Sequence, residues 1–221
     1  SREDIHKDAS PLSDSRRSMT FDPEVEKSVR EIVDAVRDHG DKAVIEYTRR
    51  FDGVTLDRIE RVPVEILREL HARVDGAFLD ALRGAAVNVR RFHERQLRET
   101  CWMEEPDGVR LGLRYLPLDA VGLYVPGGAA AYPSSIVMNA VPAQGAGVRR
   151  IAVVTPPGRF HENPHVAAAL VELGIEEVYT VGGAQAVAAL AFGTESIPRV
   201  DKIVGPGNLY VAFAKKMVFG T

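Results

Sequence analysis

Three polar side chains stand at or just past the ends of short apolar stretches: Tyr124, Gln185 and Asn208. The Gln185 amide can both donate and accept hydrogen bonds, which suits binding of ribose hydroxyls or of a carboxamide. Asn208 could instead be only a helix N-cap, and Tyr124 could be a strand residue that packs in the core. Because each residue follows a different apolar stretch, only a parallel sheet would bring all three to one edge.

The loops around these residues carry few groups that could move protons. General acids and bases are usually His, Asp, Glu, Lys or Cys. His161 and His165 are four residues apart across an expected helix start and have no evident carboxylate partner, so we expect a surface role for them. Glu195 and Asp201 could both be structural. We therefore predict binding residues but no catalytic residue and no metal ligand in this chain.

The second half of the sequence repeats one pattern four times: an apolar strand, a Gly/Pro loop and a helix. Apolar strands that alternate with helices predict a parallel sheet covered on both faces, and so an α/β fold with a doubly wound sheet. The helices that follow the loops would point their N-termini at one crevice, which suits a phosphate-bearing ligand. A GxGxxG fingerprint is missing. The predicted strands are 120–125, 151–154, 178–181 and 202–204.

The first half has a different composition, since 45 of the 59 charged residues and only 6 of the 19 glycines lie in residues 1–118. Apolar residues at helical spacing predict helices over 23–40 and 41–50 and a longer helix after Asp75. On that longer helix we expect a solvated face carrying Arg83, Arg90 and Glu94. The alternation in residues 110–116 predicts a strand. Its expected apolar stripe consists of Phe78, Leu82, Ala85, Val89 and Phe92.

We therefore predict a boundary near residue 118, with a mainly helical segment over 1–118 and the sheet domain over 119–221. A net charge of −3 gives no basic excess that would favour nucleic acid as a partner. The apolar runs fall short of the roughly 20 residues that span a bilayer, so we expect no membrane partner. The single cysteine, Cys101, excludes an intrachain disulfide and a cysteine-based zinc cage. These features and the lack of an apolar signal core predict a cytoplasmic protein.

The loop sequences also resemble one enzyme family. The stretch GLYVPGGAAAYPSSIVMNAVPAQGAGV is followed by VTPP and then by VGGAQAVAALAFGTESIPRVDKIVGPGNLYVAFAKKMVFG, and this order is similar to that of histidinol dehydrogenase. The stretch GDKAVIEYTRRFDG resembles the N-terminal region of the same family. The resemblance implies a Rossmann-like sheet domain preceded by a segment that belongs to a second, incomplete α/β domain.

The resemblance also implies a function and a set of ligands. Family members contain zinc, form homodimers and use two NAD to oxidise the amino alcohol L-histidinol through the aldehyde to L-histidine, the last step of histidine biosynthesis. In this sequence the family's NAD contacts fall on Tyr124 in LYVPGG, Gln185 in GGAQA and Asn208 in GPGN. Pro126 and Pro206 would line the same cleft by position.

The sequence departs from the family in length. The family continues with a Gln-x-x-His zinc motif, further zinc ligands and a Glu-His pair for acid/base work, and no Gln-x-x-His occurs here. We therefore expect an N-terminal portion that binds NAD but is inactive by itself. Two alternatives stay open: a paralogous dehydrogenase of another small alcohol, and a non-catalytic nucleotide-binding or oligomerisation module. A continuation of the same reading frame that carries the zinc motif would exclude the second.

Overall fold

The computed structural model describes residues 23–127 and 132–221. Its centre is a four-stranded sheet in the order β5-β4-β3-β6, and each pair of neighbouring strands is parallel. The predicted α/β fold with a parallel sheet is thus confirmed. The strands are β3 (Ala120–Tyr124), β4 (Arg150–Val154), β5 (Val178–Tyr179) and β6 (Lys202–Val204).

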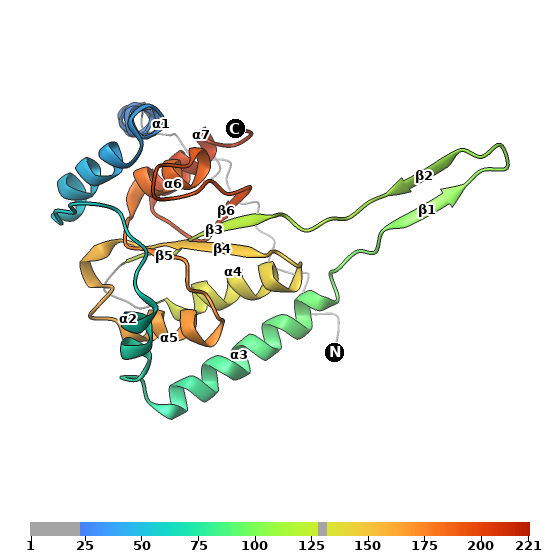
Figure 1. Ribbon diagram of the computed structural model, residues 1–221, viewed down its shortest axis with the longest axis horizontal. Coiled ribbons are helices and arrows are strands. Elements are labelled where there is room, and N and C mark those ends of the chain that lie inside the picture. Colours follow the sequence, from blue (N-terminus) through green and yellow to red (C-terminus); the bar gives the residue numbers. More distant parts are fainter. Residues whose placement is uncertain (1–22, 128–131) are drawn as a thin grey trace, which may run out of the picture.

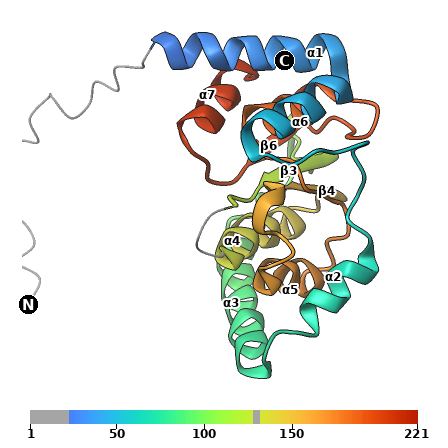
Figure 2. The same ribbon diagram turned by 90° about the vertical axis from the view of Figure 1, so that its left-hand side faces the viewer.

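Helices cover both faces of this sheet (Figure 1). Figure 2 shows one face under α1 (Pro23–Asp52), α6 (Gly183–Phe192) and α7 (Leu209–Met217). The opposite face is covered by α4 (Pro133–Gly145) and α5 (Pro164–Glu172), and α3 (Gly76–Glu94) and α2 (Val64–His71) pack outside these two. A 3₁₀ turn, Pro157–Arg159, precedes α5. This two-sided cover explains why β3 is buried along its whole length.

The side chains of the strands alternate between two apolar clusters. Tyr124 and Val154 join the cluster under α1, α6 and α7, whereas Leu123 and Val153 join the cluster under α4 and α5. Each cluster also contains residues of helices that lie within residues 1–118, so these helices supply core residues to both faces. In addition, the N–H of Val62 donates to the β5 carbonyl of Val178 at 2.8 Å, along the outer edge of the sheet. The predicted division into two domains near residue 118 stays a prediction.

The first helix bends sharply at Gly40, where the backbone leaves helical geometry (φ 53°, ψ −132°). The bend is fastened to the loop that follows α6. There Glu195 accepts a hydrogen bond from the Asp41 N–H at 2.8 Å, and Ser196 donates its hydroxyl proton to the Asp41 carboxylate at 2.5 Å. The two predicted helices, 23–40 and 41–50, thus form two arms that meet at Gly40, and Glu195 has a structural contact.

The long helix α3 differs from its predicted pattern. Leu82 is buried, but Phe92 is 62% exposed. Arg83, expected on a solvated face, forms a two-pronged ion pair with Glu172 of α5 at 2.7 and 2.8 Å. Arg90 donates to the Gln144 side chain of α4 at 3.1 Å. The apolar spacing was a weak guide because α3 packs sideways against two helices, so that its long arginines also reach the body of the protein.

The strand predicted over 110–116 is shorter and has a partner that we did not predict. β1 (Cys101–Glu104) and β2 (Arg110–Leu113) pair antiparallel with Cys101 opposite Leu113. This hairpin extends away from the body of the protein (Figure 1). All residues from 101 to 119 are exposed. The hairpin therefore contributes nothing to the buried core of this chain.

Candidate functional site

Tyr124 is the last residue of β3 and only 4% of its surface is exposed. Its hydroxyl oxygen accepts a hydrogen bond from the backbone N–H of Gly183, the first residue of α6, at 3.1 Å. The hydroxyl therefore ties the end of β3 to the N-terminus of a helix that follows β5. Burial, and to a smaller extent the nearby charge of Asp52, raise the pKa of this phenol, so that it keeps its own proton to donate.

The loop between β6 and α7 lies against the backbone of the same residue. Gly205 has a left-handed conformation (φ 102°), and a Cβ atom at this position would collide with the Tyr124 carbonyl oxygen. Lys215 of α7 donates from its Nζ to the Gly205 carbonyl. Burial lowers the pKa of the Lys215 amine. Tyr124 thus touches the loops after β5 and after β6 at the carboxyl edge of the sheet.

Gln185 lies in the first turn of α6 and is 1% exposed. Neither its Oε1 nor its Nε2 has a hydrogen-bond partner. The amide oxygen lies against Gly183, the same residue that binds the Tyr124 hydroxyl. Buried polar groups in proteins are nearly always paired, with protein, water or ligand. The amide therefore supplies two donors and an acceptor for a polar molecule at this point of the sheet edge.

Two further polar residues come from the last turns of α1. Thr48 is fully buried and its hydroxyl has no partner, and one turn later the Oδ2 atom of Asp52 is buried without a partner. Burial raises the pKa of the Asp52 carboxyl. The helix α1 packs across α6, and the charge of Asp52 acts on Tyr124, whose hydroxyl meets the first residue of α6. We call Thr48, Asp52, Tyr124 and Gln185 the polar cluster.

Our sequence analysis missed Thr48 and Asp52. A signal was present, because they continue the four-residue spacing of Val36, Gly40 and Val44. The two valines are fully buried. Polar residues on such a buried stripe need partners and so indicate a polar site. We counted only apolar residues along this helix.

The remaining predicted NAD contacts lie on loops at the same edge of the sheet and are more exposed than Tyr124 and Gln185. Asn208 is exposed, and its side-chain oxygen accepts from the Val211 N–H at 3.1 Å, which makes it the N-cap of α7. Pro206 is exposed and Pro126 is half-buried. The structure thus brings Tyr124 and Gln185 together at Gly183, and places Asn208 on the loop whose Gly205 touches Tyr124.

Part of the loop after β3, residues 128–131, lies outside the described residues. The other predicted feature of this edge, a converging set of helix N-termini, follows from the parallel strands, since α4, α5, α6 and α7 each come directly after one of them. N–H groups in the first turn of a helix have no intrahelical partner and favour an anion. Here the Gly183 N–H already donates to Tyr124 and the Val211 N–H to Asn208, and α4 and α5 begin with prolines, which have no N–H.

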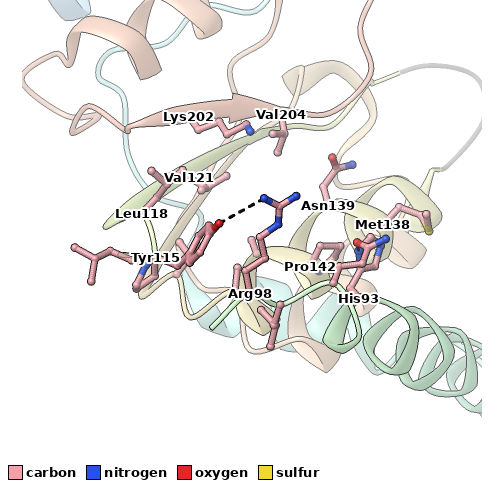
Figure 3. Close-up of a pocket in the computed structure, with 17 residues that line it drawn as sticks. His93, Arg98, Tyr115, Leu118, Val121, Met138, Asn139, Pro142, Lys202 and Val204 are labelled. Atoms are coloured by element: carbon pink, nitrogen blue, oxygen red, sulfur yellow. Dashed lines mark hydrogen bonds between the residues drawn. The ribbon is translucent and has the colours of Figure 1, made fainter. Parts of the chain in front are cut away.

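A pocket lies on the face of the sheet opposite the polar cluster, between α4 and the base of the hairpin (Figure 3). Its volume is about 580 Å³, and Val121 and Val204 line it from the sheet. Arg98 donates to the Tyr115 hydroxyl at 3.5 Å within it, and Lys202 lies at its rim. None of the five predicted cofactor residues lines this pocket. It is therefore distinct from the predicted cofactor site.

Residues 23–127 and 132–221, which the structure describes, lack two features. They contain no group of three or more His, Cys, Asp or Glu side chains arranged to hold a metal ion. No helix in these ranges has the length and apolar character needed to cross a bilayer.

Comparison with known proteins identifies the family. A family model described as histidinol dehydrogenase matches residues 15–221. The chain is 56% identical to the histidinol dehydrogenase of Geobacillus kaustophilus over 198 residues, which are 89% of this chain and 46% of that protein. It is 50% identical to the enzyme of Nitrosomonas europaea over 205 residues, 92% of this chain and 48% of that protein.

A solved structure shows the same fold. The crystal structure of histidinol dehydrogenase from Elizabethkingia anophelis superposes with a TM-score of 0.81 at 35% sequence identity, over 88% of this chain and 45% of that one. The chain spans about half the length of the curated relatives that it matches. With a family match over nearly its whole length, the chain belongs to the histidinol dehydrogenase family.

Proposed function

We propose that this chain is the NAD-binding, N-terminal portion of a histidinol dehydrogenase. The longer protein would oxidise L-histidinol through the aldehyde to L-histidine with two NAD, as the last step of histidine biosynthesis. Family membership supports this proposal, and so does the span of the chain, which covers about half of its relatives. The single free cysteine, Cys101, is exposed, which suits a reducing compartment such as the cytoplasm.

The observation that carries the cofactor assignment is the unpaired, buried amide of Gln185 at the carboxyl edge of the sheet. Ligands of open α/β sheets bind at this edge. Gly183 is half-buried, so a ligand that lies against it would reach both the Gln185 amide and the Tyr124 hydroxyl. Asn208, Pro126 and Pro206 would line the outer part of the cleft.

These residues would bind and orient the cofactor. Bound NAD supplies a hydride acceptor for the alcohol and then for the aldehyde carbon. The Gln185 amide can hold a carboxamide or ribose hydroxyls by donating and accepting at once, and Tyr124 can donate one further hydrogen bond. The first N–H groups of the neighbouring helices favour the negative charge of a pyrophosphate.

The described residues do not fit a zinc site, because they contain no suitable group of ligands. A catalytic zinc needs about three protein ligands and an open position. We therefore derive no step through zinc from this chain. Zinc, the substrate site and the acid/base pair would belong to the remainder of the longer protein, which would form a homodimer.

The assignment is tested by Gln185→Ala in the full-length protein. Loss of hydrogen bonds worth about 0.5–1.5 kcal/mol each should raise the Kd of NAD several-fold, as measured by isothermal titration calorimetry. Zinc content should not change. Gln96→Ala, at an exposed glutamine beyond α3, is the matched control and should bind NAD as the wild type does. Unchanged NAD affinity in Gln185→Ala would contradict the assignment.

Asn208→Ala is a less direct test, because Asn208 also caps α7. Loss of the cap costs about 0.5–2 kcal/mol of stability. Thermal unfolding of this variant must therefore accompany the NAD titration. A lower affinity with an unchanged unfolding temperature would support a direct contact with the cofactor.

A further inference from the structure

Asp52 is an acid that the proposed function has not used. It is the last residue of α1, and its Oδ2 atom is buried and lacks a hydrogen-bond partner. Among the described residues it forms no ion pair. One turn earlier, the fully buried Thr48 hydroxyl also lacks a partner. Asp52 as a whole is half-buried, but a carboxylate oxygen that is buried without a partner is unfavourable, so such an atom usually meets a ligand or ordered water.

These two residues lie beside the predicted cofactor contacts. The second arm of α1 packs on α6, and Val44, one turn before Thr48, belongs to the same apolar cluster as Tyr124. The pKa of the Tyr124 hydroxyl is raised mainly by burial and, to a smaller extent, by the charge of Asp52. Gly183 then links that hydroxyl to the Gln185 amide. The polar cluster therefore gathers side chains from α1, β3 and α6 within an otherwise apolar region.

The hydrogen-bonding capacity of the cluster defines its ligand. The Asp52 carboxylate accepts, the Tyr124 hydroxyl has a proton left to donate, and Thr48 and Gln185 can do both. Hydroxyl groups of a sugar donate and accept in the same way. A phosphate would be repelled by the Asp52 carboxylate. A neutral diol therefore fits the cluster better than an anion does.

We propose that Asp52 accepts a hydrogen bond from a ribose hydroxyl of the bound NAD, with the Thr48 hydroxyl beside it. The inference rests on the proposed function, because it requires NAD at this edge of the sheet. It adds a contact from α1, an element far from the Gly/Pro loops in sequence. The second arm of α1 would then form one wall of the cofactor site.

The first experiment measures NAD binding by calorimetry in the full-length protein, without turnover. Asp52→Asn should raise the Kd of NAD about tenfold, because a charged acceptor is replaced by a neutral amide oxygen. Asp57→Asn is the matched control: the same substitution five residues later, at an exposed position. It should leave the Kd unchanged. Equal affinities of Asp52→Asn and the wild type for NAD would overturn the proposal.

The second experiment uses NAD analogues that each lack one ribose hydroxyl. The wild type should bind one of them about tenfold more weakly than NAD, and Asp52→Asn, which keeps only a neutral acceptor, should discriminate clearly less between that analogue and NAD. If Asp52 only supports the fold, its variant would discriminate among the analogues as the wild type does. The wild-type titrations require no variant, so they remain decisive if Asp52→Asn does not fold. Equal wild-type affinity for NAD and every analogue would overturn the proposal.

Gln185→Ala separates the two proposals. If NAD does not bind at this edge, both Gln185→Ala and Asp52→Asn will bind NAD as the wild type does, and the proposed function fails. If NAD binds here but Asp52 does not contact it, Gln185→Ala will lose affinity while Asp52→Asn keeps it. Loss of affinity in both variants, with loss of hydroxyl discrimination only in Asp52→Asn, is the result that we expect.

Discussion

Tyr124 connects three segments that are far apart in the sequence. Its hydroxyl binds the start of α6, its carbonyl lies against Gly205, and its ring belongs to the apolar cluster under α1. A buried hydroxyl with one accepted and one available hydrogen bond can hold the protein and a ligand at the same time. The residue therefore acts both on the fold and on the predicted site.

The hydrogen bond from the Gly183 N–H to the Tyr124 hydroxyl predicts how Tyr124→Phe changes the stability of the chain. The Gly183 N–H would lose its acceptor at a largely buried position, which should lower the free energy of unfolding by about 1 kcal/mol. Urea denaturation of the full chain measures this difference. Tyr210→Phe is the control, since Tyr210 is 43% exposed, and it should unfold as the wild type does. An equal loss in both variants would show that the hydrogen bond to Gly183 adds no stability.

At the scale of single residues, the sequence predicted the candidate site residues that follow the strands better than those on α1. Tyr124 and Gln185 could be found because each follows an apolar strand, where parallel sheets place their ligands. The cap role of Asn208 was one of two predicted alternatives, and the structure shows the capping bond. Thr48 and Asp52 could not be found in the same way, because their role depends on how α1 packs across α6.

The joint between three helices depends on Glu172 of α5. Its carboxylate accepts two hydrogen bonds from Arg83 of α3, at 2.7 and 2.8 Å, and lies 2.8 Å from the His71 ring of α2. The Glu172 side chain is only 14% exposed. The Arg83 hydrogen bonds, more than the His71 contact, hold the pKa of this carboxyl below its ordinary value of 4.5. Two helices of the first half, α2 and α3, thus contact α5 through one acid.

This lowered pKa predicts a dependence of stability on pH. The folded state holds its proton less tightly than the unfolded state, so the stabilisation is complete above about pH 4.5 and is lost as the pH falls through the lower, folded-state pKa. Glu172→Gln should therefore lower the free energy of unfolding by about 1 kcal/mol at about pH 5.5. The difference from the wild type should shrink towards about pH 3.

Urea denaturation at these two pH values tests the prediction. Glu69→Gln, at an exposed acid on α2, is the matched control and should differ little from the wild type at either pH. A Glu172→Gln difference that stays constant on acidification would mean that ionisation of Glu172 does not stabilise the joint.

The elements of the sheet were easier to predict than those around it. A buried parallel strand is a continuous apolar run between turn residues. β3 carries this signal along its whole length, whereas β4 and β6 each begin with a charged residue that is followed by apolar ones. The hairpin lacks it, because β1 and β2 are exposed on both faces, so no burial pattern is imposed on them. The same reasoning explains α3, whose contacts with α4 and α5 are made by arginines as well as by apolar residues.

On the scale of the whole molecule, the hairpin is the least protected part. Trp102, Met103, Leu111 and Leu113 are each at least 50% exposed, and a two-stranded sheet is only marginally stable in isolation. Exposed apolar patches of this kind usually mark an interface. The chain covers 46% of the Geobacillus relative, so more than half of that relative has no counterpart in this chain.

The incomplete span leads to a prediction about the isolated chain. We expect it to bind no stoichiometric zinc and to have no dehydrogenase activity, although it carries the predicted NAD contacts. Three zinc ligands must be positioned together for a catalytic site, and the described residues provide no such group. The loops that carry the predicted NAD contacts are poor in general bases, and a bound alcohol is not deprotonated efficiently without one. Bound zinc alone would not give turnover, because turnover needs both a zinc site and a general base.

The purified chain can test this directly. Metal analysis after dialysis against zinc should find far less than one zinc per chain, and histidinol-dependent formation of NADH should stay at the background rate with zinc added. A full-length relative, prepared in the same way, is the positive control for both measurements. Tightly held zinc at about one per chain, or sustained turnover, would place the catalytic groups within these 221 residues and contradict the division of labour proposed here.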